Sequence, residues 1–155
     1  MGSEMCIRDR YHNKREYAEV YADEISGRYG DVINMWQPDV IMPVPIHVSK
    51  LKSRGYNQAG LIAESLSKKL NIEYNEHSLI RTRATSPMKD LNDIQRTKNL
   101  EKAFKIAGNV IIYNKVLIVD DIYTTGTTID ACAECLKRAG VKEVYAVTLC
   151  VGRGF

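Results

Sequence analysis

The sequence predicts an α/β domain: a mainly parallel open sheet with helices on its faces. Helix-like and strand-like segments alternate along the 155 residues, which is the pattern of α/β proteins. The run "KVLIVD" (115–120) is almost continuously apolar, as expected for a parallel strand buried on both faces. A helix and a second apolar strand are predicted after it, with short connections, which makes a right-handed βαβ unit. This length suits one compact domain rather than two.

The first predicted element is an amphipathic helix over residues 11–29. Tyr17, Tyr21 and Ile25 recur at four-residue steps, so their side chains would lie on one face of a helix. Gly30 follows this pattern, and glycine is common at helix ends because it adopts left-handed backbone conformations. We therefore expect the helix to end near Gly30.

A short buried strand and a second helix are expected next. The run "DVIMPVPI" is apolar, but Pro43 and Pro45 require the chain to turn at its end. Asn57 has the kind of side chain that caps a helix N-terminus. The helix predicted after it has an apolar face formed by Ala59, Ile62, Ala63, Leu66 and Leu70.

The rest of the chain predicts further strands, a loop and a last helix. The segment "NIEYNEHSLIRTR" can hold one or two strands, and the charged residues 82–92 predict a mobile loop. After "KVLIVD" we expect a helix that stops at Gly140 and a final buried strand, "VYAVTLC". The apolar face of that helix is formed by Ile129, Cys132, Ala133 and Leu136.

The composition indicates an ordinary globular protein. It is 45% apolar and 26% charged, and a net charge of +3 does not by itself indicate a nucleic-acid partner. No apolar run is long enough to span a membrane, and four cysteines without a signal peptide do not indicate a secreted disulfide scaffold. We therefore expect a cytoplasmic location. The opening "MGSEMCIRDR" has no apolar period, so we interpret residues 1–10 as a non-native leader to a domain spanning 11–155.

The residues with the clearest chemistry lie in "VLIVDDIYTTGTT" (116–128). Asp120 and Asp121 end the apolar strand, and ligands of open α/β sheets bind beyond the carboxyl ends of strands. The following turn leads into a helix N-terminus, whose backbone N–H groups favour an anion. Gly126 permits a tight turn, and the threonine hydroxyls add hydrogen-bond donors. Because the carboxylates suit ribose hydroxyls or Mg²⁺, the motif fits both parts of a phosphorylated pentose.

Other interpretations of this motif fit the residues less well. One alternative is that Asp120 and Asp121 are solvated acids followed by a threonine-rich helix cap. That structure would not require an apolar run, two acids, a glycine among threonines and an amphipathic helix in this order. A P-loop has a lysine after its glycine, where Thr127 stands here. A two-carboxylate receiver domain would need a further aspartate on a later strand, and only one strand of adequate quality follows.

The motif resembles the binding motif for 5-phosphoribosyl 1-pyrophosphate (PRPP) of type I phosphoribosyltransferases. The stretch "MPVPIHVSKLKSRGYNQAGLIAESL", followed by "RTRAT", "QRTKN" and "AF", resembles the ComF family of competence-associated phosphoribosyltransferase-like proteins. The resemblance covers nearly everything after about Tyr11, and "RGYNQA" together with the PRPP motif is specific to that family. It implies a type I phosphoribosyltransferase-like fold, PRPP as ligand and Mg²⁺ as the cofactor bound with it.

The resemblance also implies roles for individual residues. Asp120 and Asp121 match the acidic pair that holds the ribose hydroxyls, with Mg²⁺ held together with PRPP and not by the protein alone. The loop after the first strand, which is Pro45 to Arg54 here, faces pyrophosphate in relatives, and Lys52 and Arg54 are its best-placed cations. The loop that binds the 5-phosphate matches Thr124, Thr125, Gly126, Thr127 and Thr128. A second polar cluster, in or beside the mobile loop, matches Arg81, Arg83, Thr85, Arg96 and Asn99.

Three departures from the family pattern affect these expectations. The family's N-terminal four-cysteine zinc ribbon does not precede Tyr11, so we expect the phosphoribosyltransferase-like domain alone. Met88 stands where the family has a glutamine, which puts one polar contact of the mobile loop in doubt. Thr124 stands where purine-salvage relatives carry an acid for proton transfer to the base, which argues against a purine acceptor.

Some other residues favour structural roles. Cys132 and Cys135 form a CxxC on a helix with no second ligand pair, so we expect them to pack in the core rather than bind metal. Lys50 is a weaker pyrophosphate candidate than its neighbours. The loop arginines could contact single-stranded DNA, but they lack the interleaved aromatic residues on which bases stack.

Two functions remain open at this point. The chain could be a transferase of pentosyl groups (a glycosyltransferase) that moves phosphoribose from PRPP to an unknown acceptor. It could instead be a non-catalytic PRPP-sensing module that acts in DNA uptake through competence proteins. A homodimer is also left open, and no membrane association is expected.

Overall fold

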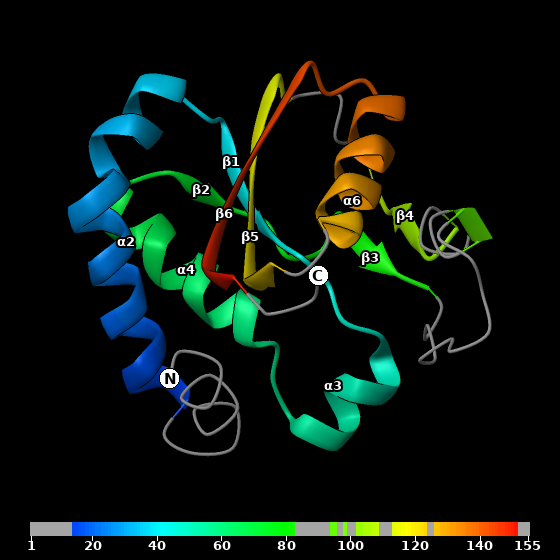
Figure 1. Cartoon of the computed structure of the whole chain (residues 1–155), viewed down its shortest axis with the longest axis horizontal. Helices are drawn as coiled ribbons and strands as arrows, with labels where there is room; N and C mark the ends of the chain where they lie inside the picture. The colour runs from blue at the N-terminus through cyan, green and yellow to red at the C-terminus, as the bar shows by residue number, and fades with distance from the viewer. Residues whose placement is uncertain are drawn as a thin grey trace.

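The structure, a computed structural model, describes residues 14–82, 94–95, 98, 102–108, 113–123 and 126–151. Parallel strands lie in the order β2-β1-β5-β6 with helices on both faces (Figure 1), so the predicted fold class is confirmed. The strands of this sheet are β1 (Val40–Pro43), β2 (Glu73–Tyr74), β5 (Lys115–Tyr123) and β6 (Glu143–Val151). The described helices are α2 (Lys14–Trp36), α3 (Val48–Arg54), α4 (Gln58–Leu70) and α6 (Thr127–Arg138). A separate antiparallel pair is formed by β3 (Leu79–Arg81) and β4 (Phe104–Ile106).

Strand β5 is the centre of the domain and is buried on both faces, as its apolar run predicted. Val116 and Ile118 belong to the core on one face of the sheet, whereas Leu117 and Val119 belong to the core on the other. All four side chains have 0% exposure. Alternate side chains of a strand point to opposite faces, so an apolar residue is needed at every position.

Helices α2 and α4 cover one face of the sheet. The apolar face predicted for α4 is confirmed, because Ala59, Ile62, Ala63 and Leu66 are buried and Leu70 packs against the same cluster. On α2, Ile25 is buried, but Tyr17 and Tyr21 are only half-buried and stack on each other with ring centroids 6.5 Å apart. The positions of α2 that reach deepest into this core are Ala18, Ala22 and Ile33.

The expected end of the first helix near Gly30 is wrong, because α2 continues to Trp36. Gly30 is buried in the middle of the helix, and a Cβ atom there would lie 3.7 Å from Leu70 Cδ2. The later turns are held by Ile33 in the core and by Trp36, whose ring stacks on Tyr145 with centroids 4.7 Å apart. The helix ends where Gln37 adopts a φ of 53°.

The other face of the sheet is covered by α6 and the β3–β4 pair. On α6, Cys132 and Leu136 are buried as predicted. Ile129 and Ala133, which were also expected to be buried, are only half-buried, and Ala131 is buried instead. The segment "NIEYNEHSLIRTR" contains the two short strands β2 and β3, and "VYAVTLC" lies in β6. The expectation that this last strand is buried is wrong, because β6 is at the edge of the sheet and its residues 144–149 are half-buried or exposed. Strand β4 was not predicted, since its three residues are too few to show a period.

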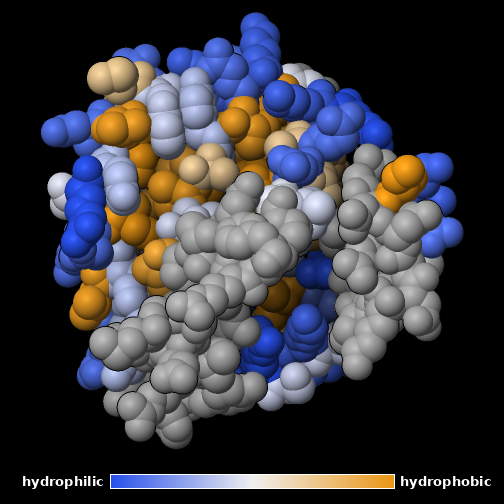
Figure 2. All heavy atoms as spheres, viewed as in Figure 1, coloured by the Kyte–Doolittle hydropathy of each residue, from blue (hydrophilic) through white to orange (hydrophobic). Residues whose placement is uncertain are grey.

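The surface differs between the two layers. Figure 2 shows apolar surface over α2 and β6 and mostly hydrophilic surface over α6 in the same view. The exposed apolar side chains of α2 include Val20, Val32 and Met35. Within the described ranges, no helix is both long and apolar enough to cross a membrane.

Candidate functional site

The acidic pair lies at the carboxyl edge of the sheet. Strand β5 pairs with β1 only as far as Val119 opposite Pro43, whereas it continues beside β6 to Tyr123. Asp120 and Asp121 therefore stand just beyond the last residue paired with β1, where that neighbouring strand turns away. Both side chains are half-exposed. This is the edge at which open α/β sheets bind ligands.

The two aspartates are held in a fixed relation. The backbone N–H of Asp121 donates to Asp120 Oδ1 over 2.8 Å. Their side chains follow each other along a strand, where successive side chains point to opposite faces. Two carboxylates at one strand end supply the hard oxygen ligands that Mg²⁺ prefers, and they can also accept hydrogen bonds from hydroxyl groups. The described part of the chain holds no group of three or more His, Cys, Asp or Glu side chains that could bind a metal ion.

Gly126 forms the turn between the acidic pair and α6. It occupies the N-cap position with a φ of 80°, a left-handed conformation that favours glycine. Its carbonyl oxygen accepts from the N–H of Asp130 over 2.9 Å, which starts the helix. As a glycine, this N-cap residue has no side chain to cap α6, and Thr127 and Thr128 are the first two residues of the helix. The positive end of the helix dipole thus lies at the same edge as the aspartates.

Arg81 is brought to this site from the β3–β4 pair. Its guanidinium lies 5.4 Å from the centroid of the Phe104 ring. Burial lowers the pKa of Arg81, and the nearby Cys132 and Asp120 oppose that shift. Arg81 therefore lies on a strand beside the region predicted as mobile, within electrostatic reach of Asp120.

The segment expected as a pyrophosphate loop is mostly a helix. His47 caps α3, accepting from the Ser49 N–H at 3.2 Å, and Gly55 ends it with a φ of 81°. Lys52 and Arg54 lie two residues apart, so they point to different sides of this helix. Lys52 is exposed and Arg54 is half-buried. The two cations therefore do not share one face of α3.

Asn57 has a different role from the predicted helix cap. It does occupy the N-cap position of α4, but its side chain makes no cap hydrogen bond. Its Nδ2 instead donates to the carbonyl oxygen of Val44 over 3.0 Å. Because Val44 follows β1 directly, this bond ties the end of the strand to the start of α4. The bond thus joins the two ends of the connection that contains α3.

The cysteine pair of α6 packs as expected. Cys132 is fully buried in the core and Cys135 is partly buried against it. Burial raises the pKa of the Cys132 thiol, and the negative charge of Asp120 adds to this effect. A thiol that keeps its proton is a poor metal ligand and a poor nucleophile, which supports a packing role.

Several predicted site residues lie outside the described part of the chain. They are Arg83, Thr85, Met88, Arg96, Asn99, Thr124 and Thr125. Of the predicted site residues that the structure describes, the acidic pair and Gly126 with its two threonines lie at one edge of the sheet, and Arg81 is near Asp120.

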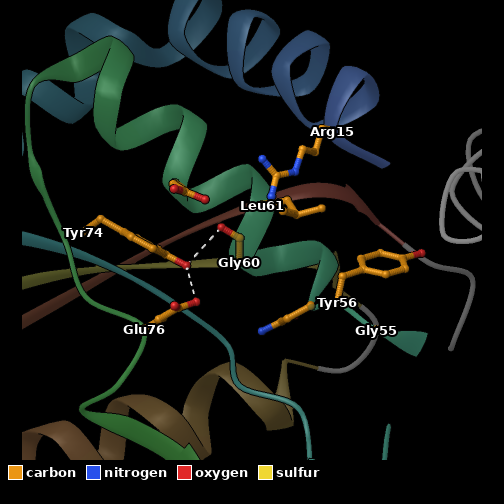
Figure 3. Close-up of a pocket in the computed structure, with 9 residues that line it drawn as sticks. Arg15, Gly55, Tyr56, Gly60, Leu61, Tyr74 and Glu76 are labelled. Carbon is orange, nitrogen blue, oxygen red and sulfur yellow. Dashed lines mark hydrogen bonds between the residues drawn. The ribbon is translucent and has the colours of Figure 1, made fainter. Parts of the chain in front are cut away.

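A cavity beside α4 was not predicted. It has a volume of about 330 Å³ (Figure 3). Its walls come from α2, residues 55–57, α4, and β2 with the residues after it, and they include Arg15, Gly60, Glu64, Tyr74 and Glu76. Part of the lining, residues 55–57, belongs to the "RGYNQA" motif, but Arg15 and Glu76 lie far from it in the chain, so the motif did not indicate a cavity.

Comparisons with known proteins agree with the fold. The phosphoribosyl transferase domain family matches residues 10–154. Competence protein F of Haemophilus influenzae is 36% identical over 109 residues, which are 69% of this chain and 48% of that protein. DNA utilization protein YhgH of Escherichia coli O157:H7 is 36% identical over 113 residues, 73% of this chain and 49% of that protein. The chain thus spans about half the length of these relatives.

The fold is also that of a solved phosphoribosyltransferase. A purine phosphoribosyltransferase from Pyrococcus horikoshii superposes with a TM-score of 0.54 at 20% identity. The match covers 84% of this chain and 73% of that one. At this level of identity the likeness concerns the arrangement of strands and helices.

Proposed function

The chain belongs to the phosphoribosyl transferase domain family as a ComF-like member, and from this premise we propose that it binds PRPP and transfers its phosphoribosyl group. The observation that carries the proposal is the position of Asp120 and Asp121 at the carboxyl edge of the sheet, next to the Gly126 turn. Carboxylates and a helix N-terminus side by side match the hydroxyls and the 5-phosphate of one ligand.

Each part of the edge has a separate task in this proposal. The carboxylates of Asp120 and Asp121 accept hydrogen bonds from the ribose hydroxyls. The turn at Gly126 and the first residues of α6 bind the 5-phosphate. Mg²⁺ bound with PRPP would supply positive charge that stabilises the leaving pyrophosphate. The two aspartates have the oxygen donors to hold that ion together with the substrate.

Transfer breaks the bond between C1 of the ribose and pyrophosphate and forms a bond from C1 to the acceptor, which loses a proton. Negative charge grows on the pyrophosphate as it leaves, so a nearby cation lowers the barrier. We assign this task first to Arg54, which is half-buried at the end of α3. Lys52 points to another side of that helix, and Lys50 is the residue that shares the side of Arg54.

A pyrophosphate-release assay tests the transfer. The protein is incubated with PRPP and Mg²⁺, with and without candidate bases and single-stranded DNA, and released pyrophosphate is measured. We expect acceptor-dependent release that is lost in Asp120→Asn. Asp31→Asn, an exposed aspartate on α2, is the control and should behave as wild type. Release that is equal in both variants would contradict the proposal.

The second candidate function is a non-catalytic PRPP-binding module that works in the cytoplasm with the DNA-uptake machinery. The names of the relatives, Competence protein F and DNA utilization protein, favour this alternative. The same assay distinguishes it from the first. PRPP binding without any pyrophosphate release would support the module, and a homodimer or a protein partner could then be sought with PRPP present.

A further inference from the structure

The cavity beside α4 has a defined set of walls. Gly60, Leu61 and Glu64 come from α4, and Tyr74 and Glu76 come from β2 and the residues after it. Arg15 of α2 and residues 55–57, between α3 and α4, complete the lining. In Figure 3 the side chains of Tyr74 and Glu76 meet below α4, and Arg15 reaches toward α4 from above. A volume of about 330 Å³ is enough for a small ligand.

Tyr74 gives this cavity its polar centre. Its hydroxyl hydrogen bonds with the Gly60 carbonyl oxygen at 3.2 Å and with Glu76 Oε2 at 3.0 Å. Burial raises the pKa of Tyr74, and the negative charges of Glu76 and Glu64 raise it further. The carboxylates of Glu64 and Glu76 therefore both influence the Tyr74 hydroxyl from the walls of the cavity.

The carboxylates retain capacity for a ligand. The Glu64 side chain is 48% exposed and its ion partner Lys68 is 3.8 Å away. The Glu76 side chain is 52% exposed, and His77 Nε2 is 3.8 Å from its Oε1. A carboxylate offers about four acceptor sites, so these distant partners do not saturate it. With two carboxylates against the one guanidinium of Arg15, the charged side chains of the lining attract cations and repel anions.

We propose that this cavity binds a small organic cation that carries a guanidinium or ammonium group. The N–H groups of such a ligand donate to the carboxylates of Glu64 and Glu76 and to the hydroxyl oxygen of Tyr74. Its carbon atoms lie against Leu61. Arg15 is the unfavourable element of the site, because it carries the same charge as the ligand. The site is separate from the acidic pair of β5, and its existence does not depend on the binding of PRPP.

Nuclear magnetic resonance titration with methylguanidinium tests this proposal. Amide shifts are expected at Gly60 and Leu61, and the neutral isostere methylurea and inorganic phosphate should not produce them. Glu64→Gln and Glu76→Gln should each raise Kd about two- to fivefold, as expected for partly exposed charge pairs. Arg15→Gln should lower Kd, and higher ionic strength should raise it.

A matched control is available on the other layer of the domain. Glu134 is on α6, its side chain is 52% exposed, and it pairs with Arg138 one turn later, as Glu64 pairs with Lys68. Glu134→Gln should leave the methylguanidinium titration unchanged. An equal effect of Glu134→Gln, or weaker binding in Arg15→Gln, would overturn the proposal. PRPP titration of the same samples reports on the proposed function separately, so failure of either one is recognised by itself.

Discussion

Comparing Gly126→Ala with Gly108→Ala should separate the effect of the Gly126 turn on phosphate binding from the effect of backbone strain on stability. Gly126 and Gly108 both have a φ of 80°, so an alanine at either position is held in a left-handed conformation. That conformation costs about 1–2 kcal/mol for a residue with a Cβ atom. For a domain of this size we expect each variant to lower Tm by about 2–8 °C.

The two variants should differ in ligand binding. Gly108 follows β4, and a Cβ atom there would have no heavy atom within 4 Å, so Gly108→Ala carries the backbone strain alone. Gly126 is buried at the N-cap of α6, at the turn assigned to the 5-phosphate. Gly126→Ala puts a methyl group at this turn, so we expect ribose 5-phosphate binding to weaken about tenfold or more, the effect of preventing one charge-assisted hydrogen bond to the phosphate.

Isothermal titration calorimetry and thermal unfolding of both variants measure the two effects. Equal affinity for ribose 5-phosphate in Gly126→Ala and Gly108→Ala would refute the assignment of the turn. An unchanged Tm in Gly108→Ala would refute the estimate of backbone strain. Wild-type protein that binds neither ribose 5-phosphate nor PRPP at millimolar concentration would refute the enzymatic proposal.

Three further predictions concern charge, tethering and pH. Asp120→Asn and Asp121→Asn keep the shape but remove charge, so in calorimetry they should weaken Mg²⁺-dependent PRPP binding more than ribose 5-phosphate binding. Asn57→Ala leaves the buried Val44 carbonyl without its donor and should lower the free energy of unfolding by about 1–3 kcal/mol in urea titrations; an unchanged value would contradict the tether. The raised pKa of Tyr74, due mainly to burial, means that the folded state keeps this proton above pH 10.0, where the unfolded state loses it. Stability should therefore fall as pH rises above that value, and a Tyr74→Phe variant with the same alkaline slope as wild type would contradict this.

The fold could be predicted where the spacing of apolar residues along the chain reflects which side chains are buried in the folded domain. An apolar residue at every position of β5 is possible only with a layer on each face, so a single strand indicated both layers. The same reasoning failed at Gly30, because α2 is extended by contacts with distant residues. Trp36 stacks on Tyr145 at the other end of the chain, and no local pattern contains that information.

The segment after β1 shows the same limit for the site. The sequence "VSKLKSR" has no apolar stripe because α3 buries none of its residues, so nothing in its pattern indicated a helix. What defines this segment is its ends: His47 caps it, Gly55 terminates it, and Asn57 ties it back to Val44.

The acidic pair could be recognised because the strand, the carboxylates and the Gly126 turn are consecutive in the chain. The cavity beside α4 could not be, because Arg15, Glu64 and Glu76 meet only after α2, α4 and β2 have packed together. A site made of consecutive residues is specified by one turn, whereas a site made of separate elements depends on how those elements pack. Substitutions that shift α2 against α4 should therefore disturb the cavity while leaving the Gly126 turn intact.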